Sequence, residues 1–111
     1  MELSRGDIVL INFNPAKGGE IGKLRPAIIL SQQEDNEILD TIIVIPLSTQ
    51  IVKNSLPYRV YIPARENLNK NSDACVNEIR ALSKNRVKEK LAKISLNELL
   101  IIQQSLCEIV G

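Results

Sequence analysis

Short apolar runs rich in β-branched residues, separated by polar turns, make up most of the chain. The strongest run covers residues 41–49 and is interrupted only late, by Pro46. Runs of this length bounded by turn residues are typical of buried strands. A cluster of glycines at residues 17–23 predicts a flexible loop. The pattern predicts strands at residues 8–13, 24–31, 41–49 and 58–62, a mixed strand at 73–82 and a last short strand at 91–94.

Only the end of the chain has clear helical spacing. Ser95 followed by Glu98 is the capping-box pair that begins a helix, and apolar residues then recur at helical intervals as far as Val110. Residues 84–87 could form one helical turn, whereas the acidic stretch at 33–40 is expected to be a turn or hairpin loop. Five to seven short strands with one terminal helix predict a mainly β fold, a small barrel.

Composition narrows the classes of protein. With 111 residues, of which 44% are apolar, the chain is predicted to form a single domain over residues 1–111. It has no histidine, and two distant cysteines do not make a metal-binding pattern, so neither a metal nor a cofactor is expected. The first residues lack the pattern of a signal peptide, and no apolar run reaches about 18 residues. The expected location is the cytoplasm.

The net charge of +1 does not by itself indicate a nucleic-acid binder, but the charges are unevenly placed. Five basic residues stand against one acid between Lys84 and Lys93. The simplest interpretation of such a run is a solvated face. It could also flank a site and hold an RNA backbone through its phosphates, with an affinity that falls as salt rises.

Three motifs, in order along nearly the whole chain, resemble the MazF/PemK (Kid) family of toxins. The first consists of Arg5-Gly6-Asp7-Ile8-Val9, Asn14-Pro15-x-Lys17-Gly18-Gly19-Glu20 and Arg25-Pro26-Ala27-Ile28-Ile29. The second is Ile45-Pro46-Leu47-Ser48-Thr49-Gln50, and the third runs from Ala74 to Arg80 and on to Ala81-Leu82-Ser83 and Arg86-Val87. The resemblance implies a homodimeric SH3-like barrel that cleaves single-stranded RNA without a metal and is held in check by a cognate antitoxin.

The resemblance also implies which residues carry the chemistry. The catalytic arginine of the family falls on Arg25, its hydroxyl residue on Ser48 and its loop glutamate on Glu20. Many relatives have threonine at the position of Ser48, which keeps the hydroxyl. The third motif departs further, because it contains Asn77-Glu78 and no carboxylate soon after Arg80.

Cleavage by attack of the 2′-OH on phosphorus needs a base, a group that neutralises the developing charge and an acid for the 5′-oxygen. Arg25 suits charge stabilisation, because guanidinium matches phosphate oxygens in a two-pronged geometry and stays protonated. Ser48 can donate to a phosphate oxygen, and Glu20 could act as the base. Each residue also has a structural alternative. Arg25 could be a surface arginine paired with an acid, Ser48 could bond to its own turn, and Glu20 could be a solvated loop acid.

Further residues are predicted to contact RNA. Glu78 and Arg80 share a strand face by the period of two and are either a base and phosphate-binding pair or a cross-sheet ion pair. Phe13 is expected in the core, whereas Tyr61 could stack on a base. The predicted RNA-binding residues are Lys17, Lys23, Thr49, Gln50, Glu78, Arg80, Lys84 and Arg86.

Two other classes of protein are compatible with the predicted fold. One is a CcdB-like toxin that binds gyrase, which depends on C-terminal residues such as a terminal aromatic pair; this chain ends Glu108-Ile109-Val110-Gly111. The other is a non-catalytic SH3-like module that only binds RNA or a peptide. The glycine loop lacks the spacing of a nucleotide-binding loop, which excludes ATP or GTP binding.

Overall fold

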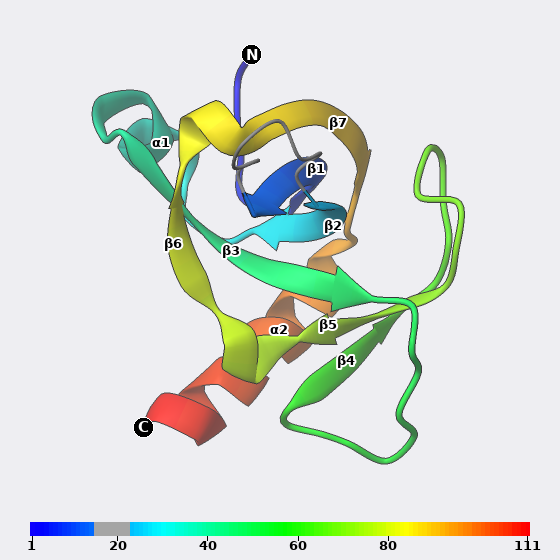
Figure 1. The fold of residues 1–111 in the computed structure, drawn as a ribbon. Coiled ribbons are helices and arrows are strands. Elements are labelled where there is room, and N and C mark those ends of the chain that lie inside the picture. Colours follow the sequence, from blue (N-terminus) through cyan, green and yellow to red (C-terminus); the bar gives the residue numbers. More distant parts are fainter. Residues whose placement is uncertain (15–22) are drawn as a thin grey trace.

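Antiparallel strands form one curled sheet in the computed structural model, which describes residues 1–14 and 23–111 (Figure 1). The strands lie in the order β4-β5-β3-β2-β1-β7, and β6 pairs with β3 outside this path. They are β1 (Asp7–Asn14), β2 (Lys23–Ile29), β3 (Thr41–Ser48), β4 (Arg59–Ile62), β5 (Ser72–Cys75), β6 (Arg80–Ser83) and β7 (Val87–Lys93). The remaining elements are the helices α1 (Gln33–Ile38) and α2 (Leu96–Val110) and the 3-10 turns η1 (Val76–Glu78) and η2 (Lys84–Arg86).

The expected mainly β fold with a C-terminal helix is confirmed. The edge strands β4 and β7 do not pair with each other in the described residues, so the small barrel is not a closed one. The strands expected at residues 8–13, 24–31, 41–49 and 58–62 correspond to β1 to β4. The helical turn expected after Ser83 is η2. The glycine loop lies outside the described residues, except for Lys23 at its end.

Strand β3 explains why the predicted strand at residues 73–82 is wrong. The end of β3 pairs with β5, through Leu47 and Ser48, whereas its beginning pairs with β6. Both strands run antiparallel to β3, but between the pairs Leu47–Ala74 and Val44–Arg80 five residues stand against two of β3, so the extra residues leave the strand as η1. Val76 in η1 is fully buried and its backbone N–H donates to the carbonyl of Tyr58, which fixes the turn. Strand β7 begins at Val87 and not at residue 91 as predicted, because its pairing with β1 extends from Lys93 back to Val87.

The acidic stretch forms helix α1, so the prediction of a turn or hairpin loop there is wrong. Its one buried residue, Asn36, donates to the carbonyls of Leu3 and Ser31 at 2.8 and 3.0 Å, and its side-chain oxygen accepts from the Ser31 hydroxyl. Glu34 and Asp35 lie in the first turn, where acidic side chains favour a helix. Contacts with distant residues thus decide the structure of this segment.

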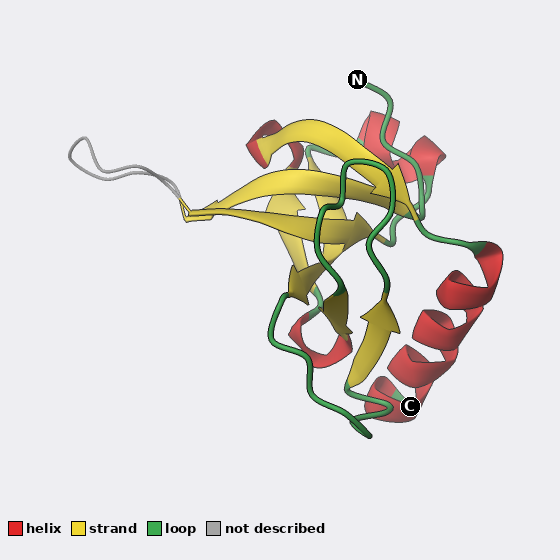
Figure 2. Ribbon diagram, turned by 90° about the vertical axis from the view of Figure 1, so that its right-hand side faces the viewer, coloured by secondary structure: helices red, strands yellow, loops and turns green. Residues whose placement is uncertain are grey.

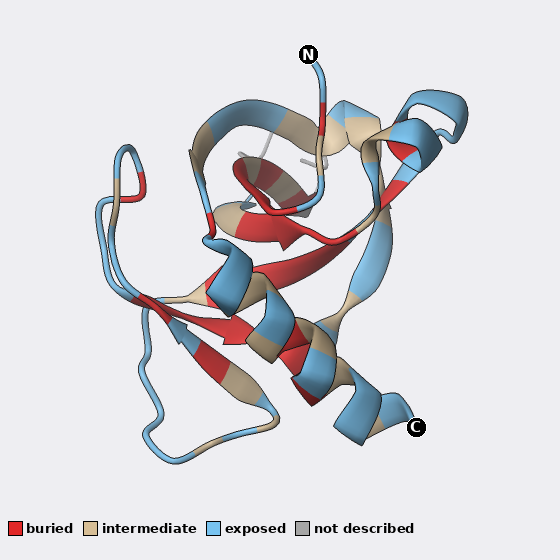
Figure 3. Cartoon of the chain, turned by 180° about the vertical axis from the view of Figure 1, so that it is seen from behind, coloured by how far each residue is buried: buried red, intermediate tan, exposed pale blue. Residues whose placement is uncertain are grey.

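Buried side chains gather in two cores, one on each side of the central strands. The first lies between the sheet and α2, which packs against β4 and η1 and leaves its other face exposed (Figures 2 and 3). The second is built on the opposite face of β1, β2 and β3 and includes Val9, Ile11, Phe13, Ala27 and Val44. The side chains of the candidate site continue this second face.

The start of α2 is held by the expected capping box, in which Ser95 and Glu98 bond to each other's backbone. Arg65 also donates to both carboxylate oxygens of Glu98. This bond lowers the pKa of Glu98, against the opposing effect of burial. Because the pKa falls on folding, the stabilisation is present above the unfolded-state value and is lost as the pH falls through the lower folded-state value.

We therefore expect Glu98→Gln to lower the free energy of unfolding by about 1 kcal/mol at neutral pH. Urea unfolding of both proteins from pH 7 to pH 3 checks this, and the two stabilities should converge at the acidic end. Equal stability of the two proteins at neutral pH would contradict the role of the Arg65–Glu98 pair.

Candidate functional site

A cleft of about 460 Å³ lies where the start of β2 meets the end of β3. Its walls come from two short segments, residues 23–26 and 47–50. Five residues that the sequence predicts for the site line this cleft: Lys23, Arg25, Ser48, Thr49 and Gln50. The structure thus brings together residues from the first and second motifs.

Arg25 and Ser48 line the same cleft. Ala27–Pro46 is the last residue pair of the β2–β3 ladder, and Arg25 and Ser48 each lie two residues beyond it along their strands. Both residues are half-buried. The Arg25 guanidinium donates to the carbonyl of Leu47 at 3.2 Å, which holds it beside the end of β3. A permanent positive charge and a hydroxyl therefore share one side of the cleft.

Phe13 lies under two arginines. The Cζ atom of Arg80 is 4.5 Å from the centroid of the Phe13 ring, and that of Arg25 is 5.8 Å from it. Both distances are within the range of a cation–π interaction. The expectation that Phe13 is buried is confirmed, since it is 5% exposed. Arg86 donates to the Phe13 carbonyl at 2.8 Å, so three arginines converge on this residue.

Ser48 makes the bond to its own turn that the sequence allowed. Its hydroxyl oxygen accepts from the backbone N–H of Gln50 at 3.2 Å. This bond uses a lone pair and leaves the hydroxyl proton for another acceptor. The turn orients the hydroxyl without using up its ability to donate.

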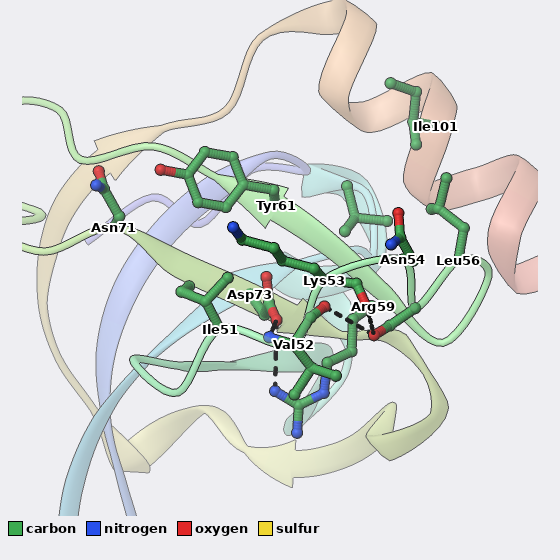
Figure 4. A pocket seen from close by; sticks show the side chains of 12 residues that line it. Ile51, Val52, Lys53, Asn54, Leu56, Arg59, Tyr61, Asn71, Asp73 and Ile101 are labelled. Carbon is green, nitrogen blue, oxygen red and sulfur yellow. Dashed lines mark hydrogen bonds and ion pairs between the residues drawn. The ribbon is translucent and has the colours of Figure 1, made fainter.

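A buried ion pair fixes the segment that follows Ser48 (Figure 4). Asp73 of β5 is paired with Ser48 of β3 and is 2% exposed. Its carboxylate accepts from the backbone N–H of Val52 at 2.8 Å and lies 3.5 Å from the Arg59 guanidinium. Arg59 also donates to the Gln50 carbonyl at 2.9 Å. No sequence motif indicates either residue, although an acid inside a short strand of small residues is a signal of a buried pair.

These two residues also line a larger hollow of about 710 Å³, bounded by residues 51–56, β4 and Ile101 of α2 (Figure 4). Tyr61, which could stack on a base, lines this hollow, but none of the predicted catalytic residues or phosphate-binding bases that the structure describes does. The size of a cavity therefore does not identify the site in this fold, whereas the convergence of functional side chains does.

Glu78 and Arg80 do not share a strand face, so that prediction is wrong. Glu78 belongs to η1, which interrupts the strand between β5 and β6, and β6 begins only at Arg80. Nor is the alternative of an ion pair between them present in the described part of the chain.

The thiol of Cys75 is affected by the charges of Arg25 and of the exposed Glu78. Burial raises the pKa of Cys75, the charges of Arg59 and Arg25 oppose this, and Glu78 adds to it.

The basic run does not form one surface. The Lys84 ammonium donates to the Asn36 carbonyl of α1 at 2.8 Å, beside the beginning of β3. Ser48 is at the other end of that strand, on the order of 23 Å away at about 3.3 Å per residue. Lys90 and Lys93 face Asp7, at 3.4 and 3.6 Å. Lys84 and Arg86 are the two predicted RNA-binding residues in this run. Only Arg86 lies near Arg25, because it donates to the carbonyl of Phe13, whose ring Arg25 contacts.

Glu20 and Lys17 lie outside the described residues. Among the residues that the structure does describe, no three His, Cys, Asp or Glu side chains form a group that could hold a metal ion. No helix in the described ranges is long and apolar enough to cross a membrane.

Comparison with known proteins places the chain in a family. Residues 4–110 match the model of PemK-like, MazF-like toxins of type II toxin–antitoxin systems. The match covers nearly the entire chain, so the protein belongs to this family and the resemblance of its three motifs is confirmed.

Individual relatives agree with this assignment. The chain is 36% identical over 94 residues to endoribonuclease MazF of Staphylococcus saprophyticus, covering 84% of the chain and 78% of the relative. It is 32% identical over 105 residues to endoribonuclease MazF of Staphylococcus epidermidis, covering 94% and 88%. A crystal structure of MazE–MazF from Deinococcus radiodurans superposes with a TM-score of 0.82 at 26% identity, over 100% of this chain and 97% of that one. The SH3-like barrel of these toxins is therefore the fold class of the protein.

Proposed function

We propose that the protein is a metal-independent endoribonuclease toxin that cleaves single-stranded RNA through its own 2′-OH, with Arg25 and Ser48 as catalytic residues. The observation that carries the proposal is that Arg25 and Ser48 line one cleft, in a chain of the MazF-like family. Relatives at 32–36% identity are named endoribonucleases, which supports the reaction class.

In the proposed reaction the 2′-oxygen forms a bond to the adjacent phosphorus and the bond from phosphorus to the 5′-oxygen breaks. Negative charge develops on the non-bridging oxygens, and the Arg25 guanidinium stabilises it because it is always protonated. The Ser48 hydroxyl donates to one of the same oxygens. A base takes the 2′-OH proton and an acid supplies a proton to the 5′-oxygen; Glu20 and Glu78 are the carboxylates proposed for the first task.

RNA binding is proposed to use the groups around the cleft. Lys23, Arg80 and Arg86 supply positive charge for phosphates, and Thr49 and Gln50 supply hydrogen bonds to the backbone or to bases. Lys17 and Lys84 are proposed as additional phosphate contacts. The position of Lys84 near α1 requires that RNA extend well beyond the cleft to reach it.

The products of cleavage test the proposed function. In the presence of EDTA, purified protein should cut single-stranded RNA and leave a 2′,3′-cyclic phosphate and a 5′-hydroxyl, because the attacking group belongs to the RNA. Mapping the 5′ ends and identifying the terminal phosphates by mass spectrometry measures this. Products with a 5′-phosphate, formed by attack of water, would contradict the mechanism. An absence of any cleavage would favour the gyrase-binding or non-catalytic alternatives.

The proposed regulator is a cognate antitoxin whose acidic segment, with apolar anchors, covers the RNA-binding surface. The solved MazE–MazF complex of Deinococcus radiodurans shares the fold, and the arginines around the cleft would attract an acidic peptide. Arg80→Glu should then weaken RNA and antitoxin binding together, mainly through slower association that depends on salt. Affinities for both ligands at two salt concentrations test this. Loss of RNA binding with unchanged antitoxin binding would show that the two surfaces are separate.

We also propose that the toxin acts in the cytoplasm as a homodimer. A chain of this size buries a smaller share of its surface than a larger domain does, and large apolar side chains such as Ile43, Leu56 and Tyr61 are 44–65% exposed. Sedimentation at micromolar concentration distinguishes the dimer from a monomer.

A further inference from the structure

Phe13 occupies an unusual position for a buried aromatic residue, because charged groups converge on its ring. Along β1 it continues the buried face of Val9 and Ile11, and it belongs to the second core. Besides apolar side chains, two guanidinium groups contact the ring. The Cζ atom of Arg25 is 5.8 Å from the ring centroid and that of Arg80 is 4.5 Å from it. The two Cζ atoms are therefore no more than about 10 Å apart, although Arg25 lies on β2 and Arg80 on β6.

The charges of these arginines are not neutralised by neighbours that the structure describes. Within residues 1–13 and 23–111, neither Arg25 nor Arg80 forms an ion pair. An aromatic ring attracts a guanidinium through its quadrupole and carries no net charge. It can thus orient both arginines while their positive potential toward a ligand stays intact. A carboxylate in the same place would orient them and cancel part of that potential.

The ring is itself held in place from two directions. Its side chain is 5% exposed within the second core, so the ring cannot turn away freely. Its backbone carbonyl accepts from Arg86 at 2.8 Å, which ties the end of β1 to the turn before β7. Phe13 therefore has the rigidity that is needed to support two long, charged side chains.

We propose that Phe13 is a positioning residue that sets Arg25 and Arg80 side by side as a paired phosphate clamp. This inference rests on the proposed function, because it assigns a role in RNA cleavage. Arg25 stabilises the charge that develops at the cleaved phosphate, and Arg80 holds the same stretch of RNA backbone. Phe13 touches neither the RNA nor the reacting atoms and acts only through the two guanidiniums.

The test compares three variants on single-stranded RNA. Phe13→Leu keeps an apolar side chain and removes the aromatic face, Phe13→Tyr keeps the face, and Val9→Ala perturbs the same strand and core without touching either arginine. We expect Phe13→Leu to lower kcat by about 10-fold, while Phe13→Tyr and Val9→Ala stay near the wild-type kcat. Circular dichroism and urea unfolding establish that each variant is folded at the assay temperature.

A double-mutant cycle separates positioning from packing. If Phe13 acts through Arg80, the loss in kcat/KM caused by Phe13→Leu should shrink in an Arg80→Ala background. Strictly additive losses, a wild-type kcat for folded Phe13→Leu, or an equal loss in Val9→Ala would overturn the inference. A wild-type protein that cut no RNA would overturn the proposed function, and this inference with it, so the two failures are distinguishable.

Discussion

Replacing Arg25 by alanine should reduce the rate of RNA cleavage by about 10²–10³-fold, the usual loss when one positioned donor to a developing negative charge is removed. The fold should persist, because the half-buried Arg25 guanidinium makes one hydrogen bond in the described part of the chain, to the Leu47 carbonyl, besides its contact with the Phe13 ring. Single-turnover cleavage rates measured in EDTA, together with urea unfolding, check both parts.

Arg25→Lys is the matched variant. It keeps the positive charge and loses the two-pronged geometry of the guanidinium, so its rate should lie between those of the alanine variant and the wild type. An Arg25→Ala protein that cut RNA at nearly the wild-type rate would show that the site has been assigned to the wrong arginine.

The second large effect is expected at Asp73, whose carboxylate is buried against Arg59 and the backbone of Val52. Asp73→Ala should lower the free energy of unfolding by about 3 kcal/mol, because it leaves a partly buried guanidinium without its partner. It should also slow cleavage at temperatures where the variant is folded, since the turn after Ser48 loses its anchor. Urea unfolding and cleavage rates measure the two consequences.

The Arg59–Asp73 pair can be isolated from the rest of the fold by a double variant. With Arg59→Ala already in place, the cost of Asp73→Ala should be smaller than in the wild-type background, because the remaining charge is no longer orphaned. Asp73→Asn should cost less than Asp73→Ala, since its amide oxygen can still accept from Val52. Wild-type stability in Asp73→Ala would contradict this account of the turn.

Local patterns were sufficient to predict most of the fold. The apolar runs of β1 to β4 and the capping box at Ser95 are signals within a few residues of sequence, and each corresponds to an element of the structure. Helix α1 has only the acids of its first turn as a local signal. It also depends on the bond from Asn36 to the carbonyl of Leu3, a residue that only the folded chain brings near. The break at η1 likewise depends on which end of β3 each neighbouring strand takes.

The candidate site shows the same division. Arg25 and Ser48 could be predicted from motifs that are continuous in sequence, and the antiparallel pairing of β2 with β3 brings their two segments to one cleft. The contact of Phe13 with Arg80 joins residues that are 67 positions apart in the sequence, and no local pattern indicates it. The basic run at residues 84–93 looked like one surface, but the turn η2 and the pairing of β7 with β1 direct its side chains to separate partners.

The attack by the RNA's own 2′-OH is the central claim, and one substituted oligonucleotide tests it most directly. Once the cleavage position is mapped, a matched RNA is made with a single 2′-deoxynucleotide on the 5′ side of the cleaved bond. The wild-type protein should bind both oligonucleotides with similar affinity, cut the unmodified RNA and leave the substituted one intact at that position. Equal rates of cleavage of the two at the same bond would contradict the mechanism.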